Sequence, residues 1–296
     1  MNLGLFKRNY IEDGTSVPTA GSTGYPSGHT YIHRTTGKRY VNLGTLTYSI
    51  HRDIEGMSDR YTVEERFTQK PALKAVLDTY TASVASAEAV ATNVANKNFE
   101  VVGGNMTTAL VTAATIGGFT MTTAGGANVT DDATLQPQQS TDQTRWNINW
   151  NHLKNLRFEA VIKTEAAILT DGALWAGWKL TAASEDNITT DADQCFFKYI
   201  AATSANWLCI HEANNAGATT ITTSSAVANS TIYHLVIQID GDKIARFYVN
   251  STLVGTAATA LHSSAVNFKP IIGVRQTANS SDIAVTVLGI KCSQDY

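Results

Sequence analysis

The stretch of sequence that decides the fold is residues 233–254, YHLVIQIDGDKIARFYVNSTLV. One face of its first half carries Tyr233, Leu235, Ile237 and Ile239. Alternation of apolar and polar residues is typical of a β-strand with one buried face. Asp240-Gly241 favours a tight turn because both residues tolerate a positive φ. The stretch therefore predicts a β-hairpin. Its return strand is expected to point three side chains inward: those of Ala245, Phe247 and Val249.

The hairpin belongs to a series of short apolar runs that follow Gly117-Gly118 and are separated by turn residues. The other expected strands are 119–123, 133–136, 157–164, 174–180, 194–200, 207–212, 219–223, 268–276 and 283–291. No segment with a helical period interrupts this series. Many strands without crossover helices predict an antiparallel sandwich or barrel. We therefore place one β domain at residues 117–296.

Composition narrows the classes of function. Charged residues make up 16% of the 296 residues and the formal net charge is −3, so no basic surface for nucleic acid is expected. No run approaches the roughly 18 apolar residues that cross a membrane as a helix. Cys195, Cys209 and Cys292 lack metal-ligand spacing and are expected to be small buried residues.

Residues 1–70 differ from the rest of the chain. Residues 14–28 are dense in Gly, Ser, Thr and Pro, which predicts an extended arm. A small hairpin is expected over 31–42, on either side of Gly37. Two strands this short do not bury enough apolar area to be stable alone. We therefore expect the arm to dock on another chain.

Residues 71–97 are the one segment predicted to be helical, because Pro71 suits a first helical turn and an apolar stripe follows. The stripe consists of Leu73, Leu77, Tyr80, Val84, Ala87, Ala91 and Val94. Its heptad spacing leaves two interpretations open: a helix that lies on its own β domain, or a short seam of a homotrimer. Alanines bury little area, so the helix would need the flanking domains to oligomerise. Residues 98–116 are expected to be a β-rich linker.

Several motifs of the β domain resemble a known family. They are LWAGWKL at 174–180, TDADQCFF at 190–197, PIIGV at 270–274 and the hairpin, preceded by LQP at 135–137 and TRW at 144–146. Together they look like the concanavalin A-like (laminin G-like) jelly roll of a tailed-bacteriophage virion protein. The segment 35–42 is similar to small hairpins of phage fibre and decoration proteins. The resemblance implies a mainly β fold, an antiparallel jelly-roll sandwich preceded by an extended arm and one helix.

The sequence does not predict an enzyme. Glycan hydrolases with this fold place paired carboxylates on one strand, and a retaining mechanism needs two carboxyl groups about 5–5.5 Å apart. Glu159 and Glu165 share a strand face but lie six residues apart, too distant for that pairing. No Gly-x-Ser-x-Gly motif marks a nucleophile. No catalytic residue is therefore predicted.

One loop favours a metal ion. Its oxygen ligands are Asp186, Asn187, Asp191 and Asp193. Laminin G-like domains often bind calcium at a rim loop, so the resemblance implies a calcium site here. The alternative is that Asp and Asn favour turns by bonding their own backbone. No other cofactor is predicted.

Tryptophan residues offer candidate glycan contacts, because aromatic rings pack on sugar faces. Trp146 and Trp150 are the candidates, since asparagines flank them. Burial is the alternative for both. Trp175 lies in an almost wholly apolar strand and is expected in the core.

These observations and the resemblance together predict a non-enzymatic structural protein at the virion surface. In the first interpretation it is a capsid-decorating (cement) protein. As a homotrimer, it would bind the major capsid protein or a fibre base through residues 1–70 and stabilise the shell by multivalent attachment. The alternative is a phage fibre, or a receptor-binding or glycan-binding module. A third interpretation is a cellular lectin-like domain. No nucleic-acid or membrane partner is expected.

Overall fold

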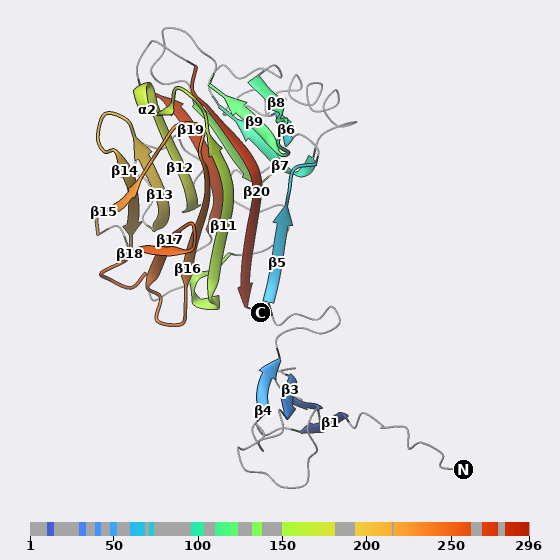
Figure 1. Cartoon of the computed structure of the whole chain (residues 1–296). Coiled ribbons are helices and arrows are strands. Elements are labelled where there is room, and N and C mark those ends of the chain that lie inside the picture. Colours follow the sequence, from blue (N-terminus) through green and yellow to red (C-terminus); the bar gives the residue numbers. More distant parts are fainter. Residues whose placement is uncertain are drawn as a thin grey trace. The chain divides into compact units, whose positions relative to one another are not determined.

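Almost all of the regular structure is β-strand (Figure 1). The computed structural model describes residues 11–14, 30–33, 39–42, 48–51, 60–68, 71–73, 96–103, 110–123, 132–137, 150–180, 193–214, 216–261, 268–277 and 282–295. The chain divides into two compact units. One consists of Met1–Tyr61 with Asp295–Tyr296, and the other of Thr62–Gln294.

The N-terminal unit contains a four-stranded sheet in the order β1-β2-β3-β4. Its strands are β1 (Ile11–Gly14), β2 (Thr30–His33), β3 (Arg39–Asn42) and β4 (Tyr48–His51). β2 and β3 pair antiparallel, which confirms the predicted hairpin. β1 adds parallel to β2 and β4 adds antiparallel to β3, so the hairpin has a neighbour on each side.

The larger unit contains two sheets. The first, which we call sheet I, has the order β15-β14-β13-β12-β19-β10-β7-β6. Its strands are β6 (Pro71–Leu73), β7 (Asn96–Val102), β10 (Asp132–Pro137), β12 (Gly172–Lys179), β13 (Gln194–Ile200), β14 (Asn206–Glu212), β15 (Thr219–Ala226) and β19 (Lys269–Gln276). Neighbouring strands pair antiparallel, except that β6 is parallel to β7.

The second sheet, sheet II, has the order β18-β17-β16-β11-β20-β9-β8, and β5 also pairs with β20. Its strands are β5 (Arg60–Glu65), β8 (Val111–Ala113), β9 (Phe119–Thr122), β11 (Leu156–Thr164), β16 (Ile232–Ile239), β17 (Ala245–Val249), β18 (Thr252–Thr256) and β20 (Ala284–Asp295). The described helices are η2 (His152–Lys154) and α2 (Ile168–Asp171). Within the described ranges no helix has the length and apolar character to cross a membrane.

Aromatic side chains fill the space between the two sheets. Three ring pairs join sheet I to sheet II, with centroids 5.3–5.7 Å apart: Trp178 with Phe158, Phe197 with Phe247 and Trp207 with Tyr233. All three are edge-to-face contacts, a favoured geometry for aromatic pairs. The expected strands are present and pack as a sandwich, so the predicted mainly β, antiparallel sandwich is confirmed.

The central hairpin has the predicted faces but a different turn. β16 and β17 bury alternate residues against sheet I. The register pairs Ile239 with Ala245, so the loop covers the five residues 240–244. The Lys243 amide donates to the Asp240 carbonyl at 2.8 Å, and Lys243 is the left-handed residue, with φ 62°, whereas Gly241 is not left-handed. The predicted tight Asp-Gly turn is therefore wrong, because a longer loop places its left-handed residue after the turn.

The central strands of sheet I are buried on both faces. Every residue of β12 is buried. Trp178 faces sheet II, whereas Trp175 lies on the opposite face in a cluster with Phe196, Leu208, Ile210 and Ile271. Strands buried on both faces read as continuous apolar runs, which explains the sequence of β12. The expected core position of Trp175 is confirmed.

The predicted helix at 71–97 is wrong at both ends. Residues 71–73 form β6 and residues 96–97 begin β7, and the two strands pair in parallel. Leu73 of the predicted trimer seam therefore lies in a strand, where backbone pairing replaces helical hydrogen bonds. The remaining seam residues, Leu77, Tyr80, Val84, Ala87, Ala91 and Val94, lie outside the described residues, so the seam stays a prediction.

The sandwich begins earlier in the chain than predicted. Most of β7 and all of β8 lie in residues 98–116, the segment expected to be a linker, yet the two strands pair within sheets I and II. β5 also joins sheet II, and the compact unit starts at Thr62. The boundary at residue 117 is therefore too late, because strands far apart in sequence complete both sheets.

Candidate functional site

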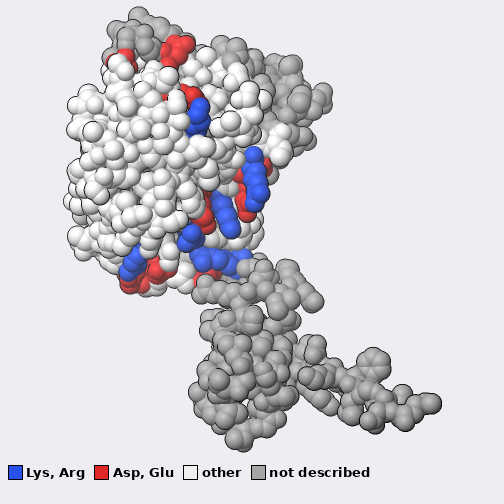
Figure 2. Space-filling model, in the orientation of Figure 1, with Lys and Arg blue, Asp and Glu red and all other residues white. Residues whose placement is uncertain are grey.

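An open groove lies on the face of sheet II that is turned away from sheet I. It has a volume of about 460 Å³ and runs along β5, β20, β11 and β16. Its lining residues are Glu64, Glu65, Arg66, Glu159, Val161, His234, Leu288, Gly289, Ile290 and Lys291. Figure 2 shows that basic and acidic side chains gather in a band on this face of the molecule. The groove is the candidate functional site.

Strand alternation supplies the polar side of the groove. β11 buries every second residue, beginning with Leu156, and therefore turns Glu159 and Val161 outward. On β16 the same alternation turns His234 outward. Val161 pairs with both His234 and Gly289, so these three residues lie side by side across the sheet.

An irregularity in β20 shapes the floor. Val161 pairs with Gly289 but Ile162 pairs with Val287, so Leu288 is the extra residue of a bulge. Bulges often lie next to functional sites because they re-aim side chains. Gly289 also lets β5 approach, since a Cβ added there would lie 3.3 Å from the Glu65 carbonyl oxygen.

Glu159 is the best-anchored carboxylate of the groove. Arg157 Nε donates to its Oε1 at 2.8 Å, and His234 Nε2 lies 3.2 Å from its Oε2. Burial raises the pKa of Glu159, but the hydrogen bond and charge of Arg157, with the His234 contact, outweigh that effect and leave the pKa below its ordinary value. Glu159 is therefore ionised at neutral pH and acts as a hydrogen-bond acceptor.

Charges of both signs line the β5 and β20 part of the groove. Arg66 bonds Glu64 at 2.8 Å, and Lys291 Nζ lies 4.0 Å from Glu64 Oε2. Glu65 accepts a hydrogen bond from the Phe67 amide at 2.9 Å. Three carboxylates and two permanent cations thus line the groove. The groove presents donors and acceptors without a strong net charge.

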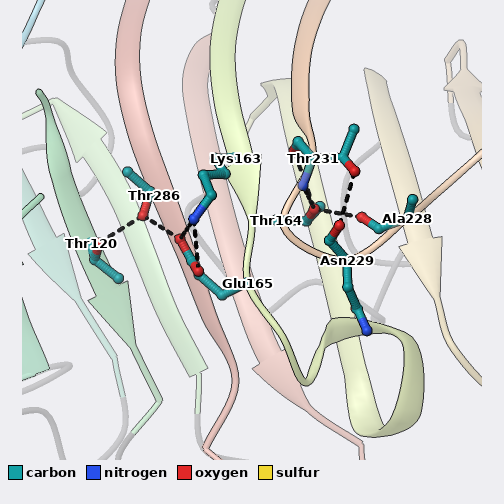
Figure 3. A network of polar contacts seen from close by, with 8 residues as sticks. All are labelled: Thr120, Lys163, Thr164, Glu165, Ala228, Asn229, Thr231 and Thr286. Carbon is teal, nitrogen blue, oxygen red and sulfur yellow. Dashed lines mark hydrogen bonds and ion pairs between the residues drawn. The ribbon is translucent and has the colours of Figure 1, made fainter. Parts of the chain in front are cut away.

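Glu165, the second outward glutamate of this region, belongs to a separate network beyond the groove (Figure 3). Lys163 Nζ contacts both of its carboxylate oxygens, at 3.0 and 3.1 Å. Thr286 donates to the same carboxylate at 2.8 Å and also bonds Thr120 at 2.7 Å. This network links β9, β20 and the end of β11, so Glu159 and Glu165 have separate sets of partners.

The predicted glycan contact at Trp150 is wrong because this side chain is fully buried. Its ring packs 5.6 Å from that of Trp178, and its backbone carbonyl accepts the Phe268 amide at 2.9 Å. An isolated β-bridge to Phe268, the residue before β19, thus holds Trp150 in the core. Trp146 lies outside the described residues, so its role stays a prediction.

The predicted calcium ligands are not brought together by the described part of the structure. Asp193 is buried, and its carboxylate accepts the Asn214 amide at 3.0 Å, which is a structural role. Asp186, Asn187 and Asp191 lie outside the described residues. Among the residues that are described, no group of three or more acidic, His or Cys side chains is arranged to hold a metal. Calcium binding at this loop stays a prediction.

The groove was not predicted from the sequence, although strand alternation places part of its lining on the outer face of the sheet. The outward position of His234 follows from the alternation of its strand, and that of Glu159 follows likewise. Residues 64–66 were assigned to the arm, because nothing local indicates that β5 pairs with β20 more than two hundred residues later. A period-two pattern in RYTVEE was the one available signal.

A comparison with protein-family models supports the fold. The model of the concanavalin A-like lectin/glucanases superfamily matches residues 172–286. A search of curated proteins found no match. Similar solved structures include a Bacillus licheniformis beta-glucanase, at 9% identity and a TM-score of 0.47, covering 78% of this chain and 97% of that one.

Two further solved structures are similar at the same level. The carbohydrate recognition domain of Emp47p has 7% identity and a TM-score of 0.47, covering 68% of this chain and 90% of that one. A protein of unknown function from Shewanella oneidensis has 11% identity and a TM-score of 0.40, covering 74% and 96%. The family match and the order of strands in the two sheets together show that the sandwich has the concanavalin A-like fold.

Proposed function

We propose that the chain is a non-enzymatic carbohydrate-binding protein and that its sandwich holds glycan in the groove of sheet II. The observation that carries the proposal is the groove itself, in which the Glu159 carboxylate is held between Arg157 and His234. The match to a superfamily of lectins and glucanases supports a carbohydrate as the ligand. The volume of about 460 Å³ lies within the usual range for small-ligand sites.

The chemistry of the groove suits sugar hydroxyls, each of which both donates and accepts hydrogen bonds. Ionised Glu159 accepts, and hydrogen bonds to charged groups are roughly twice as strong as neutral ones. Arg66, next to the end of β5, and Lys291, the partner of Glu159 on β20, can donate. The Arg157 and His234 contacts fix the Glu159 carboxylate before a ligand arrives, which lowers the entropy cost of binding.

The state of Glu159 supports binding over catalysis. A glycosidase needs a general acid that stays protonated, and enzymes obtain one by raising a carboxyl pKa. Here the Arg157 contact helps to hold the pKa of Glu159 below its ordinary value. The Glu165 carboxylate already accepts hydrogen bonds from Lys163 and Thr286. Neither glutamate is therefore suited to protonate a leaving group.

A matched pair of variants tests this function. A glycan array identifies the tightest ligand, and calorimetry then compares Glu159→Gln with Glu165→Gln. Both glutamates lie on the same side of sheet II and pair with a cation two residues earlier, but Glu165 is outside the groove. We expect Glu159→Gln to weaken binding about tenfold or more, because a hydrogen bond to a charged group contributes ~1.5–3 kcal/mol. Glu165→Gln should bind like the wild type.

Two outcomes would contradict the proposal. One is a glycan array without any bound ligand. The other is an equal loss of affinity in Glu159→Gln and Glu165→Gln, which would indicate a general effect on the sheet. Incubation with the bound glycan should also release no new reducing ends, since release would make the protein an enzyme.

We further propose that the N-terminal unit attaches the sandwich to a virion, as a capsid-decorating homotrimer or as part of a fibre. The separate four-stranded sheet of residues 1–61 supports a division between attachment and recognition. The resemblance to phage decoration and fibre proteins points to the same assembly. Gel densitometry of purified particles tests this role: a capsid-wide copy number indicates decoration, a few copies indicate a fibre, and absence from particles contradicts both.

A further inference from the structure

The groove continues into a row of side chains that crosses sheet II at right angles to its strands. Direct cross-strand pairs define the row: Lys291 with Glu159, Glu159 with Val236, Val236 with Tyr248 and Tyr248 with Leu253. Partners in such pairs project from the same face of a sheet. The row therefore begins at the groove on β20 and ends on β18, the last strand of the sheet.

The two halves of the row differ in character. Glu159 and Lys291 form the polar half, within the groove. The other half is apolar: Leu253 is 52% exposed, Tyr248 is partly exposed, and Val236, which lies between Glu159 and Tyr248 in the pairing order, is buried. A parallel row, formed by Arg157, Gln238 and Arg246, runs beside it and supplies further hydrogen-bonding groups.

We infer that the binding face extends from the groove along this row, and that its ligand is an unbranched, neutral oligosaccharide lying across the strands. Tyr248 then packs on a sugar ring remote from Glu159. This inference rests on the proposed carbohydrate-binding function and adds the length and charge of the ligand. Strands lie about 4.8 Å apart, so the row from β18 to β20 is roughly 19 Å long and accommodates several sugar rings.

Two features favour a glycan chain over a peptide. Each sugar ring has an apolar face and polar edges, which match a tyrosine ring flanked by Gln238 and Arg246. The backbone groups of β16, β11 and β20 already pair with strands on both sides, so they offer no edge for strand addition by a peptide. The mixed charges of the groove favour a neutral chain, whose affinity should change little with salt.

The test measures affinity against ligand length. The probes are the linear disaccharides and hexasaccharides of β-1,4-glucan, β-1,3-glucan, β-1,4-mannan and chitin, titrated calorimetrically into the full chain. For the bound sugar type, we expect the hexasaccharide to bind about tenfold more tightly than the disaccharide, the factor that one aromatic contact supplies. Tyr248→Ala should remove this difference and leave disaccharide binding unchanged, whereas Tyr248→Phe should retain it.

Ile232→Ala is the matched control, because Ile232 is an exposed apolar residue of the same sheet outside the row. It should behave like the wild type. Equal affinity for the two lengths, or a Tyr248→Ala variant that keeps the tenfold difference, would overturn the inference while leaving groove binding intact. If no probe binds the wild type although the glycan array shows a bound ligand, the inference fails and the proposed function stands. If the array shows no ligand either, both fail. Circular dichroism confirms that each variant is folded.

Discussion

At Gly273 the backbone of β19 leaves room for an indole ring. A Cβ added at this glycine would lie 2.1 Å from Cε2 of Trp175, its direct partner on β12. Trp175 is fully buried and packs in an apolar cluster, so it has little space to move. The requirement for glycine here arises from a neighbouring side chain and not from an unusual backbone conformation.

Gly273→Ala should therefore destabilise the sandwich. Overpacking a well-filled core costs ~1–3 kcal/mol, and we expect a loss of this size in the free energy of unfolding measured with urea. Gly241→Ala is the control, because the nearest atom to its added Cβ is Asn155 Oδ1 at 3.9 Å. Equal stability of the two variants would show that Trp175 has an alternative position.

Among the elements, the β16–β17 turn contains a residue in an unfavourable conformation. Lys243 adopts φ 62°, a left-handed conformation that costs a residue with a Cβ ~1–2 kcal/mol. Glycine carries no such penalty but has more freedom to lose on folding. We expect Lys243→Gly to raise the free energy of unfolding by up to about 1 kcal/mol, as measured by urea denaturation.

Thr256→Gly provides the comparison for the turn variant. Thr256 lies in β18 of the same meander and has an ordinary strand conformation. Glycine there should lower the free energy of unfolding by ~0.5–1 kcal/mol. It relieves no unfavourable backbone conformation and adds only the entropy cost of ordering glycine on folding. The explanation by backbone conformation would be incorrect if both glycine variants shifted stability in the same direction.

Strands could be predicted from the sequence where one of their faces is exposed to solvent. β11 shows clean alternation, and β16 shows it apart from Val236, so the inward residues of β16 were assigned correctly. β12 shows none, because it is buried on both faces, but its short length and flanking turns still identified it. β6 was missed because leucine spacing around Leu73 fits a helix equally well, and β7 was expected only as part of a β-rich linker. Their parallel pairing is a long-range contact that local periodicity does not encode.

The candidate site was harder to predict than the elements. The outward positions of Glu159 and His234 are readable, but their contact requires the pairing of β11 with β16, strands about seventy residues apart. Trp150 was misassigned because flanking asparagines suggested exposure, whereas the bridge to Phe268 holds it inside. Local polarity does not reveal a burial that depends on a distant strand.

In the whole molecule, the two compact units have separate sheets. The aromatic contacts between sheets I and II all lie within Thr62–Gln294. A fragment of residues 60–296 retains both β5 and β20 and should therefore fold without the N-terminal sheet. We expect a single cooperative calorimetric transition for the fragment. Its Tm should lie within about 2 °C of that of the sandwich in the full chain, the lower end of the shift that a loss of ~1 kcal/mol would cause.

The fragment also separates the roles of the two units. It should keep the glycan affinity of the full chain and lose attachment to particles. A fragment that aggregates or lacks a cooperative transition would show that residues 1–59 contribute to the stability of the sandwich. A fragment that still attaches to particles would place attachment on the sandwich instead.

The last strands in the sequence occupy central positions: β19 lies between β12 and β10, and β20 lies between β11 and β9. During translation, β10, β11 and β12 leave the ribosome long before β19 and β20, the strands with which they pair. Each nascent sheet therefore has strand edges with unpaired backbone groups until residues 269–295 have been synthesised. Such edges promote aggregation, so we expect the sandwich to fold only after residues 269–295 have been synthesised and to depend on chaperones during that interval.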